Sequence, residues 1–333
     1  MNVTIKDVAR AAGVSVATVS RVLNNSATVS ALATEQVNTA IKQLGYSPNF
    51  LGRNLRKCET NIILGIIPST EQTFYSEIIR GMQSAAAEQG YDILISTSNS
   101  NVNVEMRLLN MVFNRTVDAA VLLGTHIDAD ILNGLNEKYN IALCCERVKD
   151  AKVLTVTVDD VKGGYDAVMA LIAKGHRKIG MITTDGRAPS ASDREIGMRK
   201  ALEDNGIPIN EKYFYRNTYD YENGSAGFRY FMELDEPPTA IFTISDLLAV
   251  GAIKEAIRCG MTVGKDISIV GFDNILLSEM FIPGITTVAQ PCYLMGRTVI
   301  NMLVNNITSV KKNNDHILLN YELIYRDSIG EPR

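Results

Sequence analysis

Three charged residues stand out for the chemistry that their side chains could perform together: Arg194, Asp246 and Asp273. Each lies in a segment that follows a short apolar run. A guanidinium offers a planar fork of hydrogen-bond donors, and carboxylates accept hydrogen bonds from hydroxyl groups. Phe74 and Tyr221, in two further segments of this kind, could supply aromatic walls for the apolar face of a ring. This combination of side chains predicts recognition of a neutral polyol, above all a sugar.

The elements that must position these side chains are short apolar runs that alternate with amphipathic segments. Continuous apolar strands between helices are typical of parallel sheets covered on both faces. The expected strands are 62–67, 93–95, 119–123, 141–145, 178–182, 240–244 and 267–271. The expected helices are 75–89, 104–114, 129–139, 161–174, 193–205 and 247–259. The pattern predicts two doubly wound parallel-sheet lobes, whose strands end at a cleft that binds the ligand.

The net charge of −4 over 333 residues conceals an uneven distribution. Residues 1–59 carry seven basic and three acidic side chains, a net charge of +4, and the remainder carries 26 and 34, a net charge of −8. A small basic segment on a larger acidic body is the asymmetry expected of a DNA-binding module joined to another domain. Charge alone leaves open a chance excess of basic residues.

The basic segment has the pattern of three short helices. Apolar residues at helical spacing indicate a first helix near 5–12, a second near 16–24 and a third whose apolar face ends before Gly45. Gly13 can take a left-handed turn between the first two helices, and Ser15 and Ser30 can cap the second and third. Two helices around a three-residue turn, with a third completing the core, predict an all-α helix-turn-helix domain.

The second of these helices leaves short or forked side chains off its buried face. Val16, Ala17, Thr18, Ser20 and Arg21 could approach base edges and phosphates. The N-terminus of a helix also attracts phosphate through its free N–H groups. A generic three-helix bundle remains the alternative on this pattern alone.

The N-terminal run Val3–Asn24, VTIKDVARAAGVSVATVSRVLN, resembles the signature of the LacI/GalR family of bacterial transcription regulators. Gly45-Tyr46-Ser47-Pro48-Asn49 is similar to that family's junction between the DNA-binding domain and the hinge, and the resemblance continues down the whole chain. It implies a helix-turn-helix domain over 1–47, a hinge helix and linker over 48–60, and a core over 61–333. The core would have the periplasmic-binding-protein fold, with an N-lobe of about 61–159 plus 289–318 and a C-lobe of about 160–288 plus 319–333.

The resemblance also implies roles for individual residues. Val16 and Ala17 open the recognition helix, Arg21 reaches a base edge or phosphate, and Leu55 wedges between central base steps of the minor groove. The expected DNA-binding residues are Thr4, Ser15, Val16, Ala17, Thr18, Ser20, Arg21, Asn24, Tyr46, Asn49, Arg53 and Leu55. The expected effector-binding residues are Phe74, Tyr75, Glu146, Arg147, Arg194, Tyr221, Asp246 and Asp273, with Arg194 as the effector-clamping arginine.

The chain departs from the family early in its third helix. Ala33-Thr34 stands where the family usually has Thr-Arg, and Glu35 follows. The change removes an expected phosphate contact and adds a carboxylate that repels phosphate. DNA affinity weaker than is typical of the family is therefore expected.

Several other functions find no support in the sequence. No nucleophile elbow or metalloprotease motif occurs, and the three histidines lie far from one another and from paired cysteines, so no catalytic residue, metal or cofactor is expected. The five scattered cysteines do not suggest a disulfide framework. The N-terminus has no apolar signal core, and no long apolar run occurs, so we expect a cytoplasmic protein without a membrane anchor.

The resulting hypothesis is a DNA-binding regulator, a repressor, that responds to a small carbohydrate and binds a pseudo-palindromic operator as a homodimer. The dimer follows by resemblance, because tetrameric relatives carry a leucine-heptad tail after the last core segment. One alternative is a catabolite-control-type regulator switched by a seryl-phosphorylated phosphocarrier protein. Its docking helix usually has Asp after the tyrosine, whereas Leu294 follows Tyr293 here, and Arg297 could still meet a phosphate. A second alternative is a sugar-binding receptor without a DNA role.

Overall fold

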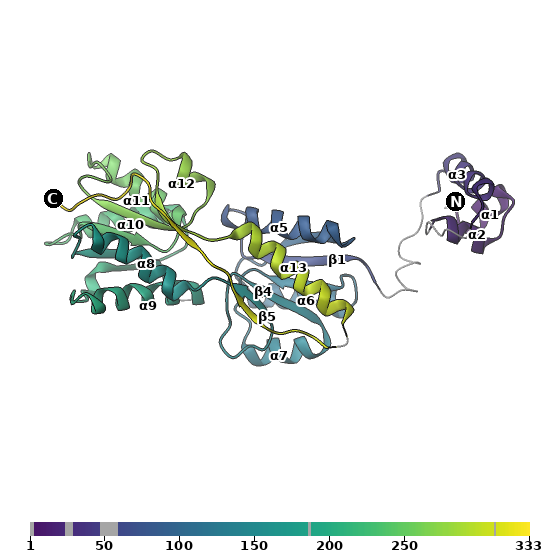
Figure 1. Ribbon diagram of the computed structural model, residues 1–333, viewed down its shortest axis with the longest axis horizontal. Helices are drawn as coiled ribbons and strands as arrows, with labels where there is room; N and C mark the ends of the chain where they lie inside the picture. Colours follow the sequence, from purple (N-terminus) through teal and green to yellow (C-terminus); the bar gives the residue numbers. More distant parts are fainter. Residues whose placement is uncertain (1–2, 24–28, 47–58, 186–187, 310) are drawn as a thin grey trace. The chain divides into compact units, whose positions relative to one another are not determined.

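The computed structural model of the chain describes residues 3–23, 29–46, 59–185, 188–309 and 311–333. Its internal contacts divide the chain into two compact units, with the division between Glu59 and Thr60 (Figure 1). We call these units the head and the core. None of the helices in the described ranges has the length and apolar character that a membrane span requires.

The described residues of the head form three helices, which confirms the predicted helix-turn-helix pattern. They are α1 (Ile5–Ala12), α2 (Val16–Leu23) and α3 (Ala31–Leu44). Gly13 ends α1 with a left-handed φ of 65°, a conformation that glycine adopts at no steric cost. The Ser15 hydroxyl accepts the Thr18 N–H at 3.1 Å, and the Ser30 hydroxyl accepts the Ala33 N–H at 3.3 Å. Both serines therefore cap their helices as expected.

The apolar faces of the head helices meet in one small core. Val8 of α1, Val19 of α2 and Val37 of α3 are fully buried, and Tyr46 packs against this cluster from the end of α3. Burial of one face fixes which side of α2 points outward. The outward side of α2 is the one that carries Val16, Ala17 and Arg21.

The core contains two six-stranded sheets, in agreement with the predicted pair of parallel-sheet lobes (Figure 1). The N-lobe sheet has the order β11-β5-β4-β3-β1-β2, and all its neighbouring strands are parallel. Its strands are β1 (Ile62–Ile67), β2 (Asp92–Thr97), β3 (Ala119–Leu122), β4 (Asn140–Cys144), β5 (Leu154–Thr157) and β11 (His316–Leu318). Its helices are α5 (Phe74–Glu88), α6 (Val102–Phe113), α7 (Ala129–Lys138) and α13 (Cys292–Thr308).

The C-lobe sheet has the corresponding order β12-β10-β9-β8-β6-β7, with β12 antiparallel at its edge. Its strands are β6 (Ile179–Thr184), β7 (Phe214–Asn217), β8 (Ala240–Thr243), β9 (Ser268–Asp273), β10 (Thr286–Ala289) and β12 (Glu322–Ile324). Its helices are α8 (Asp160–Ala173), α9 (Pro189–Asp204), α10 (Tyr221–Met232), α11 (Asp246–Arg258) and α12 (Leu276–Met280), with the short 3-10 helix η1 (Glu211–Tyr213).

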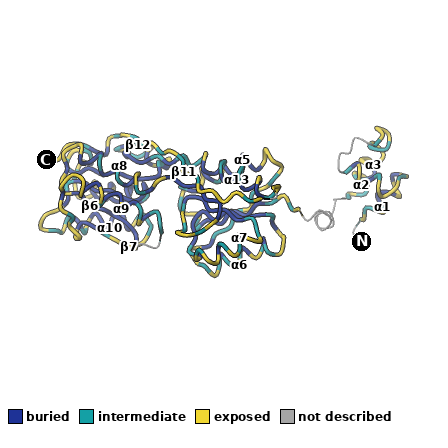
Figure 2. The backbone as a smooth tube through the Cα atoms, turned by 60° about the horizontal axis from the view of Figure 1, so that its bottom comes forward, coloured by how far each residue is buried: buried dark blue, intermediate teal, exposed yellow. Residues whose placement is uncertain are grey.

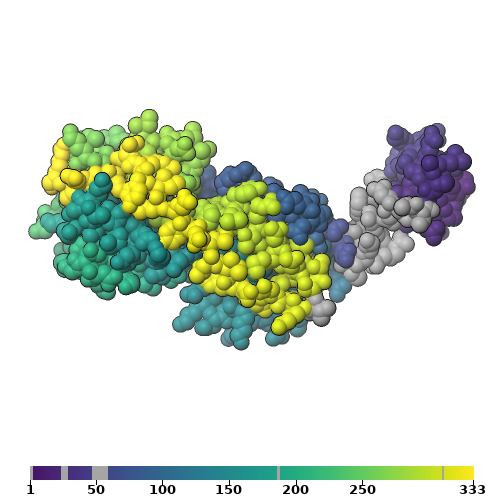
Figure 3. Space-filling model, viewed as in Figure 1, coloured from purple at the N-terminus to yellow at the C-terminus, as the bar shows by residue number. Residues whose placement is uncertain are grey.

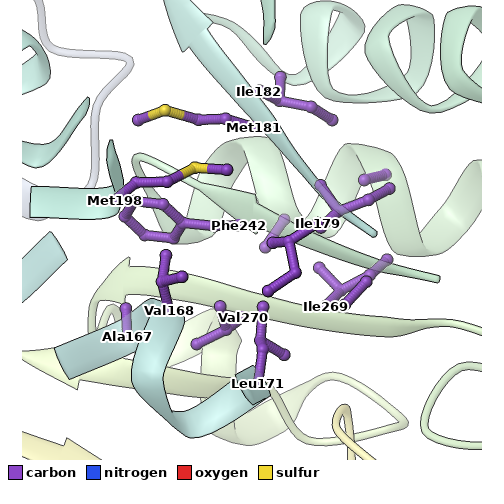
Figure 4. Close-up of a cluster of buried hydrophobic side chains, with 14 of the residues drawn as sticks. Ala167, Val168, Leu171, Ile179, Met181, Ile182, Met198, Phe242, Ile269 and Val270 are labelled. Atoms are coloured by element: carbon purple, nitrogen blue, oxygen red, sulfur yellow. The ribbon is translucent and has the colours of Figure 1, made fainter. Parts of the chain in front are cut away.

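Both faces of each sheet are covered, as the continuous apolar strands predicted (Figure 2). Along β1, Ile63 and Ile67 face the cluster under α5 and α13, whereas Leu64 and Ile66 face the cluster under α6 and α7. This alternation follows the two-residue period of a strand. In the C-lobe, helix α8 and strands β6, β8 and β9 enclose a buried apolar cluster that includes Met181, Met198 and Phe242 (Figure 4).

Three segments of the chain cross between the lobes. They connect β5 to α8, β10 to α13, and β11 to β12. The C-terminal segment lies across the surface of both lobes, as Figure 3 shows. These crossings bring the carboxyl ends of both parallel sheets to the boundary between the lobes, where ligands of doubly wound folds bind.

Two element boundaries differ from the prediction in ways that affect the site. Helix α9 begins at Pro189 rather than near 193, because proline is favoured in the first turn of a helix. Arg194 therefore lies in the second turn of the helix and not at its start. Tyr221 was predicted in a loop, but it is the first residue of α10, because the Asp220 carboxylate caps that helix by accepting the Asn223 N–H at 2.7 Å.

Candidate functional site

A cavity of about 560 Å³ lies between the two lobes of the core. Among the residues that the structure describes, five predicted effector-binding residues line it: Phe74, Tyr75, Glu146, Arg194 and Asp273. The other described lining residues are Pro68, Gln72, Ser100, Glu105, Gly124, Thr125, His126, Cys145, Thr184, Asp185, Ala188, Pro189, Ser190, Ala191, Arg216, Asn217, Thr218, Tyr219, Ile244 and Gln290. The volume is within the range of small-molecule sites.

Arg194 is the most heavily engaged side chain of the cavity. It is 5% exposed, and its Nε donates to Asp160 Oδ1 at 2.8 Å while Nη1 donates to the carbonyl of Ile244 at 2.5 Å. Its Nη1 is also 3.6 Å from Asp273 Oδ1, and the guanidinium lies 3.6 Å from the centroid of the Phe272 ring. Such fixed contacts hold a planar fork of donors in one orientation.

Two glycines allow Arg194 to reach Asp160. Helix α8 carries Gly164 and helix α9 carries Gly197, and the two helices touch at these positions. A Cβ atom on Gly164 would lie 2.4 Å from the Arg194 carbonyl oxygen, and one on Gly197 would lie 2.1 Å from the Val161 carbonyl oxygen. The close helix contact therefore depends on both glycines and positions the ion pair.

Burial dominates the electrostatics of this cluster. It raises the pKa of Asp160 and of Asp273 to about 7 against the opposing attraction of Arg194. For Arg194, burial disfavours the charged form, but the two carboxylates outweigh burial and raise the guanidinium pKa further. One arginine is thus shared by two carboxyl groups, each with a pKa of about 7.

Asp273 is held in a single orientation at the end of β9. Its Oδ1 accepts Gln290 Nε2 at 2.8 Å, and its Oδ2 accepts the Tyr219 hydroxyl at 3.4 Å. Its backbone has a φ of 111°, a conformation that costs energy for a residue with a Cβ atom. Strain at this position is consistent with a functional carboxylate held in place by its surroundings.

Aromatic side chains form part of the cavity wall. The rings of Phe74 and Tyr75 lie edge to face with their centroids 5.3 Å apart at the start of α5. Tyr75 is almost fully buried, which raises the pKa of its hydroxyl. Tyr219 adds a third ring from the C-lobe. These rings can cover the apolar face of a sugar or a nucleobase.

Glu146 connects the two lobes across the cavity. It follows β4 in the N-lobe, whereas Ser190 lies in the first turn of α9 in the C-lobe. Glu146 Oε1 accepts the Ser190 hydroxyl at 2.7 Å, and Oε2 accepts the Ser190 N–H at 3.0 Å. Burial raises the pKa of Glu146 despite these two hydrogen bonds. A ligand between the lobes would lie beside this bridge.

The structure places three predicted residues outside the lining of the cavity. Asp246 is fully buried at the start of α11, where its Oδ2 accepts the Ile275 N–H at 2.9 Å and burial raises its pKa well above the usual value. Tyr221 packs in α10 with Lys254 Nζ 5.1 Å from its ring centroid. Arg147 is exposed. Tyr219, two residues before Tyr221, supplies the ring that we had assigned to Tyr221.

Sequence reasoning also missed several polar groups of the site. Asp160, Glu105, Ser190 and Gln290 contact residues that are far away in sequence, so no local pattern marks them. The capping role of Asp220 was the one available signal that Tyr221 begins a helix.

The head presents its predicted DNA-reading residues to different degrees. Val16 is 41% exposed, and Ala17 and Arg21 are also exposed at α2. The side chains of Ser15 and Thr18 hydrogen-bond each other at 2.9 Å, and Ser20 is half-buried. The Thr4 N–H and hydroxyl donate to Asp7 Oδ2 at 3.0 and 2.6 Å, and these hydrogen bonds lower the pKa of Asp7. Tyr46 is half-buried. Asn24, Asn49, Arg53 and Leu55 lie outside the described residues.

Candidate metal ligands do not cluster in the part of the chain that the structure describes. No group of three or more His, Cys, Asp or Glu side chains there could hold a metal ion.

A helix-turn-helix head joined to a two-lobed α/β core with a polar cavity defines a class of bacterial regulators. The chain belongs to the lacI family of bacterial regulatory proteins, whose model matches residues 4–49. The model of a periplasmic binding protein-like domain matches residues 168–329. This confirms the family inferred from the N-terminal run.

Relatives and solved structures agree with this assignment. The chain is 35% identical over 328 residues to the HTH-type transcriptional repressor CytR of Escherichia coli strain K12, covering 98% of this chain and 96% of the relative. The transcriptional regulator CelR in complex with cellobiose matches with 30% identity and a TM-score of 0.75, covering 98% and 100%. The lac repressor dimer bound to operator and the anti-inducer ONPF matches with 26% identity and a TM-score of 0.86, covering 98% and 99%.

Proposed function

We propose that this chain is a sequence-specific transcriptional repressor whose operator affinity is controlled by a small metabolite, a sugar or sugar derivative, bound in the cavity between its lobes. The observation that carries the proposal is the pair of Arg194 and Asp273 in that cavity, with Arg194 held from behind by Asp160, on a chain with a helix-turn-helix head. The similar proteins are transcriptional regulators, and we propose no catalytic role.

The head supports DNA binding through both shape and charge. Helix α2 exposes Val16 and Ala17 at its N-terminus, where free N–H groups attract phosphate. Arg21 lies five residues on, exposed and long enough to reach a base edge or the backbone. The lac repressor, with which the chain shares its fold over both units, is bound to operator DNA in the matching structure. Chromosomal DNA is in the cytoplasm of bacteria, so we place the protein there.

The cavity supports binding of a polyhydroxylated ligand. Arg194 supplies donors, Asp273 and Glu146 supply acceptors, and Phe74 and Tyr219 supply ring faces. Hydroxyl groups need such a mixture of donors and acceptors, because each hydroxyl both donates and accepts. The regulator CelR was solved with cellobiose, which is a ligand of this chemistry.

The position of the cavity explains how a ligand could control the head. Both lobes line it, and Glu146 of the N-lobe already bonds Ser190 of the C-lobe across it. A ligand that binds one arrangement of the lobes better than another shifts the equilibrium between them. If those arrangements differ in operator affinity, ligand and operator affect each other's binding reciprocally. We propose residues 48–60 as the hinge that transmits the change.

A homodimer fits this mechanism, because two heads would match a pseudo-palindromic operator. The core has an apolar surface around α12 that is available for association. Leu276 is 72% exposed, Met280 is 66% exposed and Ile282 is 87% exposed. Neighbouring exposed apolar side chains of this size mark interaction surfaces. The lac repressor in the matching structure is a dimer.

The alternative signal, a seryl-phosphorylated phosphocarrier protein, has less support than a metabolite. Arg297 is a residue that could meet a phosphate, but both of its Nη atoms donate to Glu88 at 2.8 Å. The Tyr293 hydroxyl donates to Ser84 at 3.0 Å, and Leu294 is exposed where the docking helix of catabolite control proteins usually has Asp. These donors are already satisfied within the chain.

The test is the affinity of the full chain for DNA from the region upstream of its own gene. Fluorescence anisotropy should show much tighter binding to that DNA than to a scrambled duplex of the same composition. Arg21→Ala and Leu55→Ala should each reduce the preference. Equal affinity of the unaltered chain for both duplexes would contradict the proposed function.

A further inference from the structure

Glu105 is a buried carboxylate at the N-lobe side of the cavity. It lies in the first turn of α6, where the helix dipole favours a negative charge. Its relative exposure is 0%, yet it is one of the residues that line the cavity. None of the sequence patterns marked it as a ligand-binding residue.

The two oxygens of Glu105 have different surroundings. Oε2 accepts the Thr125 hydroxyl at 2.6 Å and the His126 N–H at 3.3 Å. The Thr125 hydroxyl oxygen itself accepts the Ile127 N–H at 3.1 Å, so its own proton is directed to Glu105. Oε1 has no hydrogen-bond partner among the described residues. A buried carboxylate oxygen without a donor is costly, so its retention calls for a partner.

A second unpartnered oxygen belongs to the opposite lobe. Thr184, the last residue of β6, lines the same cavity and is 8% exposed. Its Oγ1 also has no hydrogen-bond partner within the described part of the chain. One cavity therefore has an unsatisfied acceptor on the N-lobe side and an unsatisfied hydroxyl on the C-lobe side.

We propose that Glu105 is a specificity-determining residue of the cavity, whose free Oε1 accepts a hydrogen bond from a hydroxyl or amino group of the effector. Thr184 binds the same effector from the C-lobe, so that the ligand connects the two lobes. This inference rests on the proposed function, because it assumes that the cavity holds the effector. It adds the chemistry required of the ligand: a donor-bearing neutral or cationic group at Glu105, and not a phosphate or carboxylate.

The substitution Glu105→Gln tests this assignment because its geometry is constrained. Thr125 and His126 both donate to the Oε2 position, so the amide of glutamine must place its oxygen there. Its NH₂ group then occupies the Oε1 position and faces the donor of the ligand with another donor. The size of the side chain is preserved while the required acceptor is lost.

The experiment measures ligand binding to the full chain by isothermal titration calorimetry. The probes are ribose, cytidine, cellobiose and glucosamine, and the phosphorylated probes are ribose 5-phosphate and cytidine 5′-monophosphate. At least one unphosphorylated probe should bind. Glu105→Gln should weaken that binding by about tenfold to a hundredfold. Thr184→Val, which removes the hydroxyl at nearly constant volume, should weaken it by about threefold to tenfold.

Glu255→Gln is the matched control. Glu255 is also a buried helical glutamate, but it pairs with Arg229 and Arg258 away from the cavity. This control should leave the dissociation constant unchanged. A purely structural role of Glu105 would lower the melting temperature of Glu105→Gln without changing the affinity of the folded protein. Should Glu105→Gln not fold, Thr184→Val still tests the bridge.

Three results would overturn the inference: unchanged affinity in both cavity variants, binding of the phosphorylated probes alone, or binding of no probe. Operator binding, measured on the same samples by anisotropy, separates this failure from failure of the proposed function. A chain that binds its operator specifically but fails these ligand tests keeps its function and loses the assignment of Glu105.

Discussion

The head and the core use charge in opposite ways. In the head, Val16, Ala17 and Arg21 are exposed on the outward side of α2, and the unit carries a net charge of +4. In the core, Arg194 and its carboxylates are buried, come from different helices and strands, and satisfy one another. The head therefore offers exposed basic side chains to a large anion, whereas the core holds a fixed array for a small ligand.

This difference decides what a single substitution can do. Removing an exposed side chain of the head loses one contact with DNA and leaves the fold intact. Removing the arginine of the buried cluster leaves two carboxyl groups without their cation and damages the fold together with the site. The substitutions below test this contrast, beginning with the largest expected effect.

Arg194→Ala should have the largest effect. It leaves Asp160 and Asp273 without their cation and should lower the free energy of unfolding of the core by about 3–5 kcal/mol. Effector binding should be abolished. Arg199→Ala on the same helix is the control, because Arg199 is partly exposed and pairs with Glu195 and Glu211, and about 1 kcal/mol or less is expected. Chemical denaturation followed by circular dichroism measures the free energy of unfolding of both variants. Equal losses in the two variants would contradict the difference between buried and exposed charge.

Arg21→Ala should weaken operator binding by about 1–3 kcal/mol without changing the melting temperature of the core. The reason is that Arg21 is exposed and contributes little to the packing of the head. Lys42→Ala removes the same charge from the last turn of α3 and controls for the loss of net charge. Anisotropy titrations at one fixed salt concentration give the comparison. An equal loss in the two variants would show that Arg21 acts only through its charge.

Leu276→Asp combined with Ile282→Asp should convert the dimer to a monomer, because these exposed apolar side chains lie around α12. Operator affinity should then fall by about tenfold or more, since one head must bind without the other. Substitutions on the core would thus weaken DNA binding by the head. Analytical ultracentrifugation measures the mass, and Leu32→Asp, an equally drastic change on an exposed leucine of the head, should leave the dimer intact.

Asp160→Asn keeps the size of the side chain and should change the pH dependence of stability. Burial raises the pKa of Asp160 to about 7, so between about pH 4 and 7 the folded chain binds more protons than the unfolded chain. Stability from this group is therefore present at the acidic end and is lost as the pH rises through 7. Between pH 5.5 and 7.5 the variant should lose less stability than the unaltered chain, by about 2 kcal/mol. Melting temperatures that change with pH in the same way for the variant and the unaltered chain would contradict the raised pKa.

The same contrast explains what the sequence could predict. The head was predicted down to its capping residues, because Gly13, Ser15 and Ser30 act on neighbours four or fewer residues away. Seven strands of the core, β1–β4, β6, β8 and β9, were predicted because burial on both faces makes them continuous apolar runs, whereas the four-residue strands β5, β7 and β10 were not predicted. The strands β11 and β12, on either side of the last crossing between the lobes, have three residues each and are too short to show an apolar pattern.

The cavity was predicted only in part, because it is built from contacts over long sequence distances. Arg194 and Asp273 follow apolar strands and could be identified, but their partners Asp160 and Gln290 could not. Asp246 has the chemistry of a ligand-binding residue, yet its contact with Ile275 shows a buried structural role. The residue type alone does not distinguish these two roles.

The most direct test of the central claim is the salt dependence of the two binding reactions of the full chain. Operator affinity should fall about a hundredfold or more between roughly 50 and 200 mM salt, because the head displaces counterions from phosphates. Affinity for the effector should change less than about twofold over the same range, because the buried cluster is poorly screened. Operator binding that is insensitive to salt would contradict the proposed role of the basic head.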